Sequence, residues 1–166
     1  YHVLDTEGGH ADYAPIDEVQ SAVVNRLRET YGRVSLERLL SGNGLLNIYT
    51  ALCGIEDTEV IFTTPAEVVA GALDSSDQRA LQTLNIFCEG MGSAAGNLAL
   101  TYGAKGGIYI AGGVIPRFQE FFINSGFRHK FEDKGRFVSY LQPIPVYLVT
   151  RSNLGLLGAA KKLQTI

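Results

Sequence analysis

Residues 76–102 read SDQRALQTLNIFCEGMGSAAGNLALTY and carry the longest helical pattern of the chain. Their apolar side chains recur every three or four residues, at positions 81, 84, 88, 91, 95, 98 and 102. This spacing predicts a long helix with one buried apolar seam, capped by Ser75 or Ser76. Gly92 and Gly96 lie four residues apart inside it, where each costs about 1 kcal/mol relative to alanine. We interpret them as a small face that lets another backbone approach closely.

Both flanks of this helix alternate between helical and extended patterns. On the N-terminal side, the patterns predict extended segments over residues 1–5 and 10–13 and helices over 17–31, 35–40, 44–53 and 65–73. On the C-terminal side, they predict a strand over 107–111, a helix that begins at Pro116, a mixed-charge loop over 128–136, a strand within 143–150 and a glycine-rich helix from residue 153. Such alternation predicts an α/β fold, with a mixed sheet packed with helices.

The bulk composition is that of one globular domain. The 166 residues are 46% hydrophobic and 19% charged, which is enough to build a real core. A net charge of -3 argues mildly against nucleic acid, and no apolar run approaches the roughly 20 residues that span a bilayer. Cys53 and Cys88 lie in separate apolar stretches, which is typical of buried free thiols in a reducing compartment. We therefore expect a cytoplasmic protein that binds neither nucleic acid nor a membrane.

The start of the chain indicates a piece of a longer protein. The sequence opens at Tyr1 rather than at an initiator methionine, and Met91 is its only methionine. A candidate functional motif also follows within the first ten residues. We expect a partial domain whose remaining elements lie elsewhere in the full-length protein.

The best candidate site combines Glu7-Gly8-Gly9-His10 with Glu37. Two carboxylates and an imidazole suit a ring of sugar hydroxyls, and paired glycines let the backbone come close to a ligand. Taken one by one, each polar side chain is more often a solvated surface group. The prediction therefore depends on whether Glu7, His10 and Glu37 converge in the fold.

A second candidate is the Gly112-Gly113 turn at the end of a predicted strand. Open α/β sheets bind ligands beyond the carboxyl ends of their strands, where backbone N–H groups favour anions. Two glycines are a weak signal, since most such turns are simply tight connections. The mixed-charge loop likewise has two interpretations: a solvated connector, or a segment whose Lys134 and Arg136 lie near phosphate or at a subunit interface.

Other chemistries lack their motifs. The sequence contains no Walker-type phosphate loop, no dinucleotide fingerprint and no nucleophile elbow. Its three histidines and two cysteines do not show metal-ligand spacing. We expect no metal site within this chain.

Taken together, five segments resemble bacterial glucokinase, in the right order and over essentially the whole chain. They are residues 7–15, 33–45, 107–118, 131–137 and 153–158. The resemblance implies a ribonuclease H-like (actin-like ATPase) domain, with Glu7, His10 and Glu37 contacting glucose and Gly112 and Gly113 on the adenosine side of a nucleotide site. It also implies phosphoryl transfer from ATP, with Mg²⁺, to the 6-hydroxyl of glucose.

The departures from that family define which part this chain is. Its N-terminal phosphate loop and the Asn-Asp pair that supplies the catalytic base do not occur here. The resemblance therefore implies that residues 1–166 are a single partial domain, the C-terminal (large) one, without the N-terminal small domain and the first strands of its own sheet. We expect no catalytic residue in this chain and no activity from it alone. The open sheet edge invites pairing with another chain, so we expect a homodimer, or association with the missing half.

Two alternatives remain open at this stage. One is a non-catalytic sugar-sensing regulator on the same scaffold, which would need a DNA-binding segment upstream. The related repressor-type sugar kinases carry a zinc-binding cysteine cluster that this chain lacks. The other is a nucleotide-binding module without a sugar substrate, which would be favoured if Glu7, His10 and Glu37 lay far apart.

Overall fold

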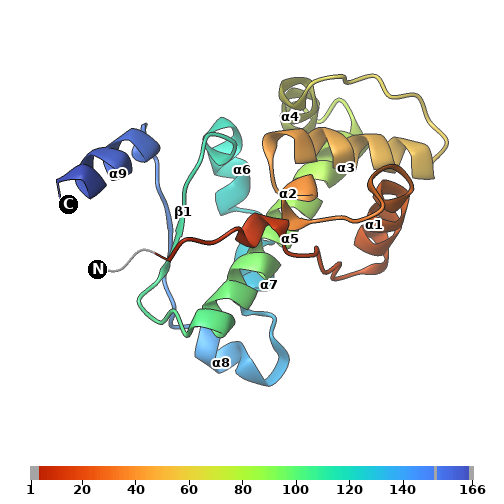
Figure 1. The fold of residues 1–166 in the computed structure, drawn as a ribbon. Coiled ribbons are helices and arrows are strands. Elements are labelled where there is room, and N and C mark those ends of the chain that lie inside the picture. The colour runs from red at the N-terminus through yellow and green to blue at the C-terminus, as the bar shows by residue number, and fades with distance from the viewer. Residues whose placement is uncertain (1–3, 152, 165–166) are drawn as a thin grey trace.

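Helix α5, Gln78–Tyr102, runs through the middle of the molecule, and α3, α4 and α7 pack against it (Figure 1). The computed structural model describes residues 4–151 and 153–164. The helix begins one or two residues later than predicted, because Asp77 is its N-cap and accepts hydrogen bonds from the N–H groups of Arg79 and Ala80. It ends at Gly103, whose φ of 60° closes the last turn.

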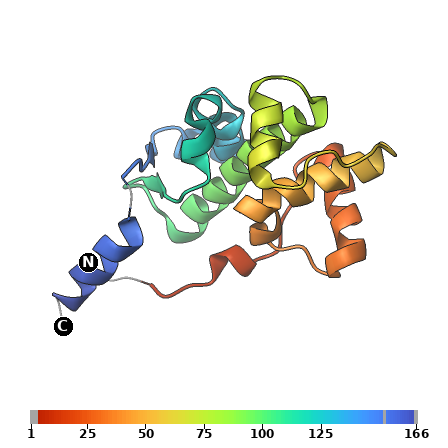
Figure 2. The same ribbon diagram turned by 90° about the horizontal axis from the view of Figure 1, so that it is seen from above.

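The helices that precede α5 form one lobe on its N-terminal half (Figures 1 and 2). They are α1 Glu18–Tyr31, α2 Leu36–Leu39, α3 Gly42–Ile55 and α4 Pro65–Leu73. The predicted helix over 65–73 is confirmed, with a complete capping box between Thr64 and Glu67. Helix α3 begins at Gly42, two residues earlier than predicted, because Ser41 accepts a hydrogen bond from the Gly44 N–H and caps it there.

The elements after α5 form a second, smaller layer around two short parallel strands. Strand β1 pairs with β2 in the register Tyr109↔Tyr147. These elements are β1 Ile108–Ile110, η2 Ile115–Phe118, α6 Gln119–Ile123, α7 Phe127–Glu132, η3 Gly135–Phe137, α8 Val138–Leu141, β2 Val146–Leu148 and α9 Leu154–Leu163. Both predicted strands are thus confirmed, whereas the predicted helix at Pro116 is split into η2 and α6. Figure 2 shows α9 standing apart from the helices that pack on α5.

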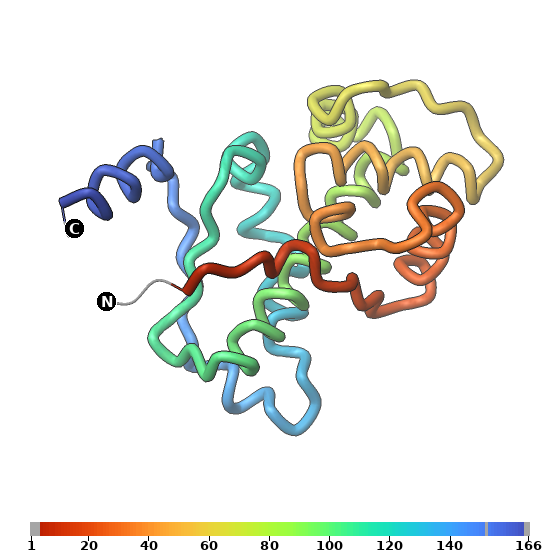
Figure 3. Tube along the Cα trace, viewed as in Figure 1, coloured from red at the N-terminus to blue at the C-terminus, as the bar shows by residue number. Residues whose placement is uncertain are grey.

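The predicted extended entry of the chain is confirmed in part, at Ala11 and Asp12, but not over the described residues 4–5, which have no regular structure. Residues 1–3 lie outside the described residues, 4–7 have no regular structure, and Gly8–His10 form the short helix η1. Only Asp12 makes an isolated antiparallel bridge, to Ser35. This first segment overlaps the strands in the view of Figure 3, but the turned view of Figure 2 shows that the two are separated.

The prediction of a mixed-charge loop over 128–136 is wrong, because residues 128–132 belong to helix α7. Phe127 and Phe131, one turn apart, are buried against α5, so the segment gains a buried face that its charges conceal in the sequence. Arg128 then fixes the following chain by donating to the carbonyls of Ile144 (2.9 Å) and Gln142 (2.7 Å).

The glycines of α5 are explained by this packing, as predicted. A Cβ at Gly92 would lie 2.2 Å from the Phe127 carbonyl oxygen, and one at Gly96 would lie 2.4 Å from that of Phe131. Both distances are far below van der Waals contact, so the backbones of α5 and α7 meet only because neither position has a side chain.

The predicted apolar seam of α5 is buried only in part. Leu84, Cys88 and Ala95 are buried, but Leu98 is 44% and Tyr102 is 58% exposed. On α1 the buried face is Gln20, Val23, Val24 and Leu27, while Val19 is exposed. The two cysteines are buried and unpaired with each other, as predicted. In the described part of the chain, no helix is long and apolar enough to span a bilayer.

The α5–α7 contact predicts opposite effects for two glycine-to-alanine changes. Gly92→Ala should lower the free energy of unfolding by about 1–3 kcal/mol, because its Cβ forces the two backbones apart. Gly158→Ala in α9 meets nothing within 4 Å among the described residues, so it should leave stability unchanged or raise it by up to about 1 kcal/mol. Urea unfolding of both variants measures the difference; equal stabilities would contradict the close contact.

Candidate functional site

Glu7, His10 and Glu37 converge at one corner of the molecule. His10 lies between the two carboxylates, with Nδ1 3.9 Å from Glu7 Oε2 and Nε2 3.6 Å from Glu37 Oε2. The fold therefore brings the three predicted residues together. We call these three residues the carboxylate–histidine cluster.

Local backbone geometry brings the cluster together. The turn of η1 places Glu7 beside His10, since the His10 N–H donates to the Glu7 carbonyl at 2.9 Å. Two further backbone bonds then tie this segment to the start of α2, from Leu36 N–H to Ala11 O (2.9 Å) and from Tyr13 N–H to Val34 O (3.0 Å). The two segments lie close together here, since a Cβ at Gly9 would be in ordinary van der Waals contact with that of Glu37 at 3.8 Å.

The side chains of the cluster remain open to solvent. Glu7 is 92% exposed, His10 65% and Glu37 59%. Exposed ion pairs contribute little to stability, so these groups are not needed to hold the fold. They are available to a ligand, and a sugar hydroxyl could reach more than one of them.

Cavities lie on both sides of the cluster. A cavity of about 690 Å³ has Gly8, Gly9 and Glu37 at one end and apolar side chains of α5 and β1 along its length. A second one, of about 290 Å³, is almost wholly polar and is lined by His10, Arg33, Ser35, Glu37, Arg38, Ser41, Asn43 and Asn47. A sugar ring has a rim of hydroxyls and apolar C–H faces, so a boundary between polar and apolar surfaces suits it.

The Gly112-Gly113 turn borders a separate cavity of about 630 Å³. Residues from both strand ends and from the start of α9 line it: Ala111, Gly112, Gly113, Pro116, Val149, Thr150, Arg151, Asn153, Leu154 and Gly155. It therefore lies beyond the carboxyl ends of two parallel strands, as ligand sites do in open α/β sheets. Gly112 has φ of 140°, a conformation that favours glycine, and a Cβ at Gly113 would meet no described atom within 4 Å.

Lys134 and Arg136 do not reach this cavity. The Lys134 side chain turns inward and donates from Nζ to Ser93 Oγ on α5 at 3.1 Å, so part of the predicted solvated connector is docked on the helix. Burial lowers the pKa of Lys134 below its usual value. Arg136 is exposed and lies over the Phe137 ring. His129 is exposed and lies on helix α7.

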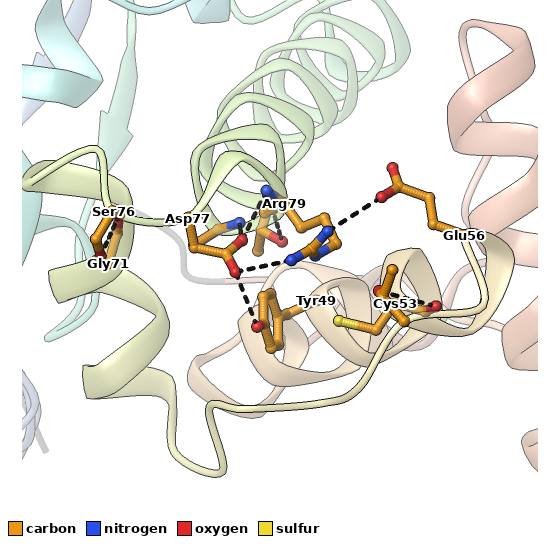
Figure 4. A network of polar contacts seen from close by, with 10 residues as sticks. Tyr49, Cys53, Glu56, Gly71, Ser76, Asp77 and Arg79 are labelled. Carbon is orange, nitrogen blue, oxygen red and sulfur yellow. Dashed lines mark hydrogen bonds and ion pairs between the residues drawn. The ribbon is translucent and has the colours of Figure 1, made fainter.

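A separate polar cluster, drawn in Figure 4, lies outside both candidate sites and joins α3 to the start of α5. The Asp77 carboxylate accepts from the Tyr49 hydroxyl (3.3 Å) and pairs with Arg79 (3.1 Å), which also pairs with Glu56 (3.3 Å). Burial acts to raise the pKa of Asp77, but the Ala80 N–H and the charge and N–H groups of Arg79 lower it overall. The partners of Asp77 all come from the protein itself, so this cluster stabilises the fold. The sequence analysis missed it, since Tyr49 and Asp77 are 28 residues apart.

No group of three or more histidine, cysteine, aspartate or glutamate side chains within residues 4–151 and 153–164 is placed to hold a metal ion. Among the described residues, the carboxylate–histidine cluster and the backbone around Gly112 are the predicted sites that border cavities.

Solved structures define the class of protein to which this fold belongs. It superimposes on a crystal structure of glucokinase from an Antarctic psychrotroph with a TM-score of 0.91 and 37% identity, covering 99% of this chain and 51% of that one. A glucokinase from Balamuthia mandrillaris, solved in complex with glucose, gives a TM-score of 0.78 over 90% of this chain and 44% of that one. At 17% identity, the second comparison shows the shared fold alone. The fold is the helix-rich α/β fold of these glucokinase structures.

Sequence comparisons give the family. A curated glucokinase from Hahella chejuensis is 55% identical over 161 residues, which are 97% of this chain and 50% of the relative. One from Tolumonas auensis is 51% identical over the same shares. The family profile described as Glucokinase matches residues 1–166, and the chain belongs to the glucokinase family. It spans about half the length of the curated relatives that it matches.

The buried cluster around Tyr49 predicts an alkaline loss of stability. Burial, and then the neighbouring Cys53 and Asp77, raise the pKa of Tyr49 to about 12, against 10.0 for the free side chain. The folded state keeps the proton while the unfolded state loses it, so this contribution is constant below pH 10 and is lost between about pH 10 and 12.

Tyr49→Phe removes that titration and should flatten the fall in the urea midpoint across this pH range. Some slope should remain, because burial also raises the pKa of Tyr13. An unchanged slope in the Tyr49→Phe variant would show that Tyr49 does not titrate in this way.

Proposed function

We propose that the full-length protein containing this chain transfers the γ-phosphoryl group of ATP to the 6-hydroxyl of glucose. The observation that carries this proposal is the convergence of Glu7 and Glu37 on His10, with each carboxylate within 4 Å of the imidazole, exposed and bordered by two cavities. Membership of the glucokinase family supports the same activity. The alternative of a nucleotide-binding module without a sugar substrate would be favoured by a large separation of these three residues. Their convergence counts against it.

In this proposal the cluster binds and orients the sugar. The Glu7 and Glu37 carboxylates accept hydrogen bonds from hydroxyls, and the imidazole of His10 between them adds a further polar contact. Phosphoryl transfer depends mainly on positioning and charge stabilisation, so holding the ring in one orientation is itself a catalytic contribution. Which hexose fits best depends also on residues outside this chain.

The cavity at Gly112 and Gly113 is proposed to hold the adenosine side of ATP. The fit rests on accessible backbone N–H groups, the absence of described atoms near Gly113, and the location beyond two strand ends. Mg²⁺ would neutralise charge on the phosphates when the nucleotide is bound. The described residues contain no group of carboxylate, histidine or cysteine side chains that could hold Mg²⁺. We therefore assign the ligands of Mg²⁺ to the phosphates of ATP and to the rest of the full-length protein.

The remaining machinery is assigned to the rest of the full-length protein. We propose that the catalytic base lies there, that residues 1–166 are part of the C-terminal large domain on a ribonuclease H-like, actin-like ATPase core, and that this chain alone is inactive. We further propose a cytoplasmic homodimer. The buried, unpaired Cys53 and Cys88 support a reducing compartment. A sugar-sensing regulator on this scaffold remains the alternative, and phosphorylation of glucose by the full-length protein distinguishes the two.

Replacing either carboxylate should weaken glucose binding without affecting the fold. Glu7→Gln and Glu37→Gln in the full-length protein should each raise the KM for glucose roughly ten- to a hundredfold, through loss of a charge-assisted hydrogen bond. Glu59→Gln is the matched control, since Glu59 is exposed and lies outside these cavities. A coupled phosphorylation assay gives both KM values; unchanged glucose kinetics for Glu7→Gln would remove Glu7 from the site.

The Gly112 turn should affect the nucleotide alone. Gly112→Ala introduces a Cβ at φ of 140° beside the proposed adenosine cavity, so the KM for ATP should rise at least severalfold while the KM for glucose stays within twofold. Gly135→Ala is the control, because Gly135 also has a positive φ (54°) but lies away from that cavity. If both variants change the KM for ATP equally, the effect is general backbone strain.

A further inference from the structure

The segment that carries His10 is weakly anchored by its own residues. The described structure buries none of residues 8–10 and shows no side-chain cap on η1. The turn is closed by two backbone bonds, from His10 N–H to Glu7 O (2.9 Å) and from Ala11 N–H to Gly8 O (3.1 Å). A single exposed turn without buried side chains opens readily. The positions of Glu7 and His10 therefore depend on contacts with a neighbouring segment.

Arg33 makes such a contact from the segment between α1 and α2. Its Nη2 donates to the His10 carbonyl oxygen at 2.5 Å, and its Nε pairs with Asp12 Oδ1 at 2.6 Å. One guanidinium thus holds the chain on both sides of Ala11. The N–H donors of a planar guanidinium form a rigid fork that fixes direction as well as distance, whereas an ammonium acts as a point charge.

The backbone on either side of Arg33 is itself fixed. Helix α1 ends at Gly32, whose φ of 69° turns the chain and whose N–H donates to Arg28 O at 2.8 Å. The next residue, Val34, is 4% exposed, and its carbonyl accepts from the Tyr13 N–H at 3.0 Å. A side chain that extends from a fixed backbone can hold a looser segment in position.

The other carboxylate of the cluster is placed independently of Arg33. Glu37 lies on α2, which is tied to α3 because Asn47 Nδ2 donates to the Arg38 carbonyl at 2.9 Å. The Oδ1 of the same Asn47 accepts from the Tyr31 hydroxyl at 3.1 Å, and the Arg38 guanidinium lies over the Tyr31 ring at 4.0 Å. The η1 turn is therefore the part of the carboxylate–histidine cluster whose placement depends on Arg33.

Stability does not account for this arrangement. The side chains of Arg33 and Asp12 are 59% and 74% exposed, and ion pairs this open to solvent contribute little to the free energy of folding. Arg33 also lines the polar cavity beside His10 and Glu37. Its Nε and Nη2 are nevertheless directed at Asp12 and the His10 carbonyl, so its effect on a ligand there passes through the segment that it holds.

We propose that Arg33 is a positioning residue of the sugar site, a role that rests on the function proposed above. Its guanidinium fork binds the His10 carbonyl and Asp12 and so keeps the η1 turn closed. Because the His10 N–H is bonded to the Glu7 carbonyl, the closed turn places the imidazole and the Glu7 carboxylate together, facing Glu37. Arg33 acts on glucose only through His10 and Glu7.

Kinetics of the full-length protein test this role. Arg33→Gln removes the fork and should raise the KM for glucose about three- to thirtyfold, with the KM for ATP within about twofold and the Tm within about 2 °C of the unmodified values. Arg33→Lys keeps the charge without the fork, so its KM for glucose should remain raised at least about threefold.

Arg26→Gln is the matched control. The Arg26 side chain is 50% exposed, against 59% for Arg33, and it also pairs with a single carboxylate, that of Glu29. Arg26 lies outside both cavities that border the cluster. Its substitution should leave both KM values within about twofold of those of the unmodified protein.

Hydrogen exchange gives a readout that does not depend on activity. The amides of His10 and Ala11 should exchange about tenfold faster in Arg33→Gln than in the unmodified protein or in Arg26→Gln, because their bonds close the η1 turn. Equal exchange in all three proteins, or full recovery of the KM for glucose in Arg33→Lys, would overturn the proposal. A large fall in Tm with an unchanged KM for glucose would also overturn it, since Arg33 would then be purely structural. If the unmodified protein does not phosphorylate glucose, the proposed function fails, whereas the exchange rates still decide whether Arg33 holds the turn.

Discussion

The close contact between the backbones of α5 and α7 is the constraint on which the rest of the structure depends. Gly92 and Gly96 leave room for the Phe127 and Phe131 carbonyls, and the two phenylalanine rings enter the core. Helix α7 then holds the chain before β2 through Arg128. A third glycine, Gly90, receives the Tyr13 hydroxyl, since a Cβ there would lie 2.3 Å from it. These three glycines thus fix the positions of two segments relative to α5: the chain that leads into β2, and the N-terminal segment at Tyr13.

The two carboxylate clusters show how structural and ligand-binding charges differ. Asp77 is buried and satisfied by Tyr49, Arg79 and backbone N–H groups, so its charge is balanced within the chain. Glu7 and Glu37 instead flank His10 at distances of 3.6–3.9 Å and are largely exposed. A charge that is not needed by the fold, yet is held in place by short backbone connections, is free to interact with a ligand.

Local signals in the sequence were sufficient for most of the helices. The capping box at Thr64 and Glu67, and the Asp17 cap of α1, act within four residues and need no tertiary context. Packing decided the places where prediction was wrong. Helix α7 was predicted as a loop because its charges outnumber its two buried phenylalanines, and Asp77 caps α5 in place of a serine because Tyr49 and Arg79 stabilise its carboxylate there.

The sequence by itself determined most of the elements, the residue types of the candidate site and the family resemblance, because caps, periodicity and motifs are local properties of the chain. Tertiary structure alone decided that Glu7, His10 and Glu37 meet, since 30 residues separate Glu7 from Glu37 and contacts between residues 10–13 and 33–36 close that distance. It also decided that Leu98 and Tyr102 are exposed, although their spacing continues a buried seam. Periodicity shows which side chains share a face, whereas burial depends on whether another segment covers that face.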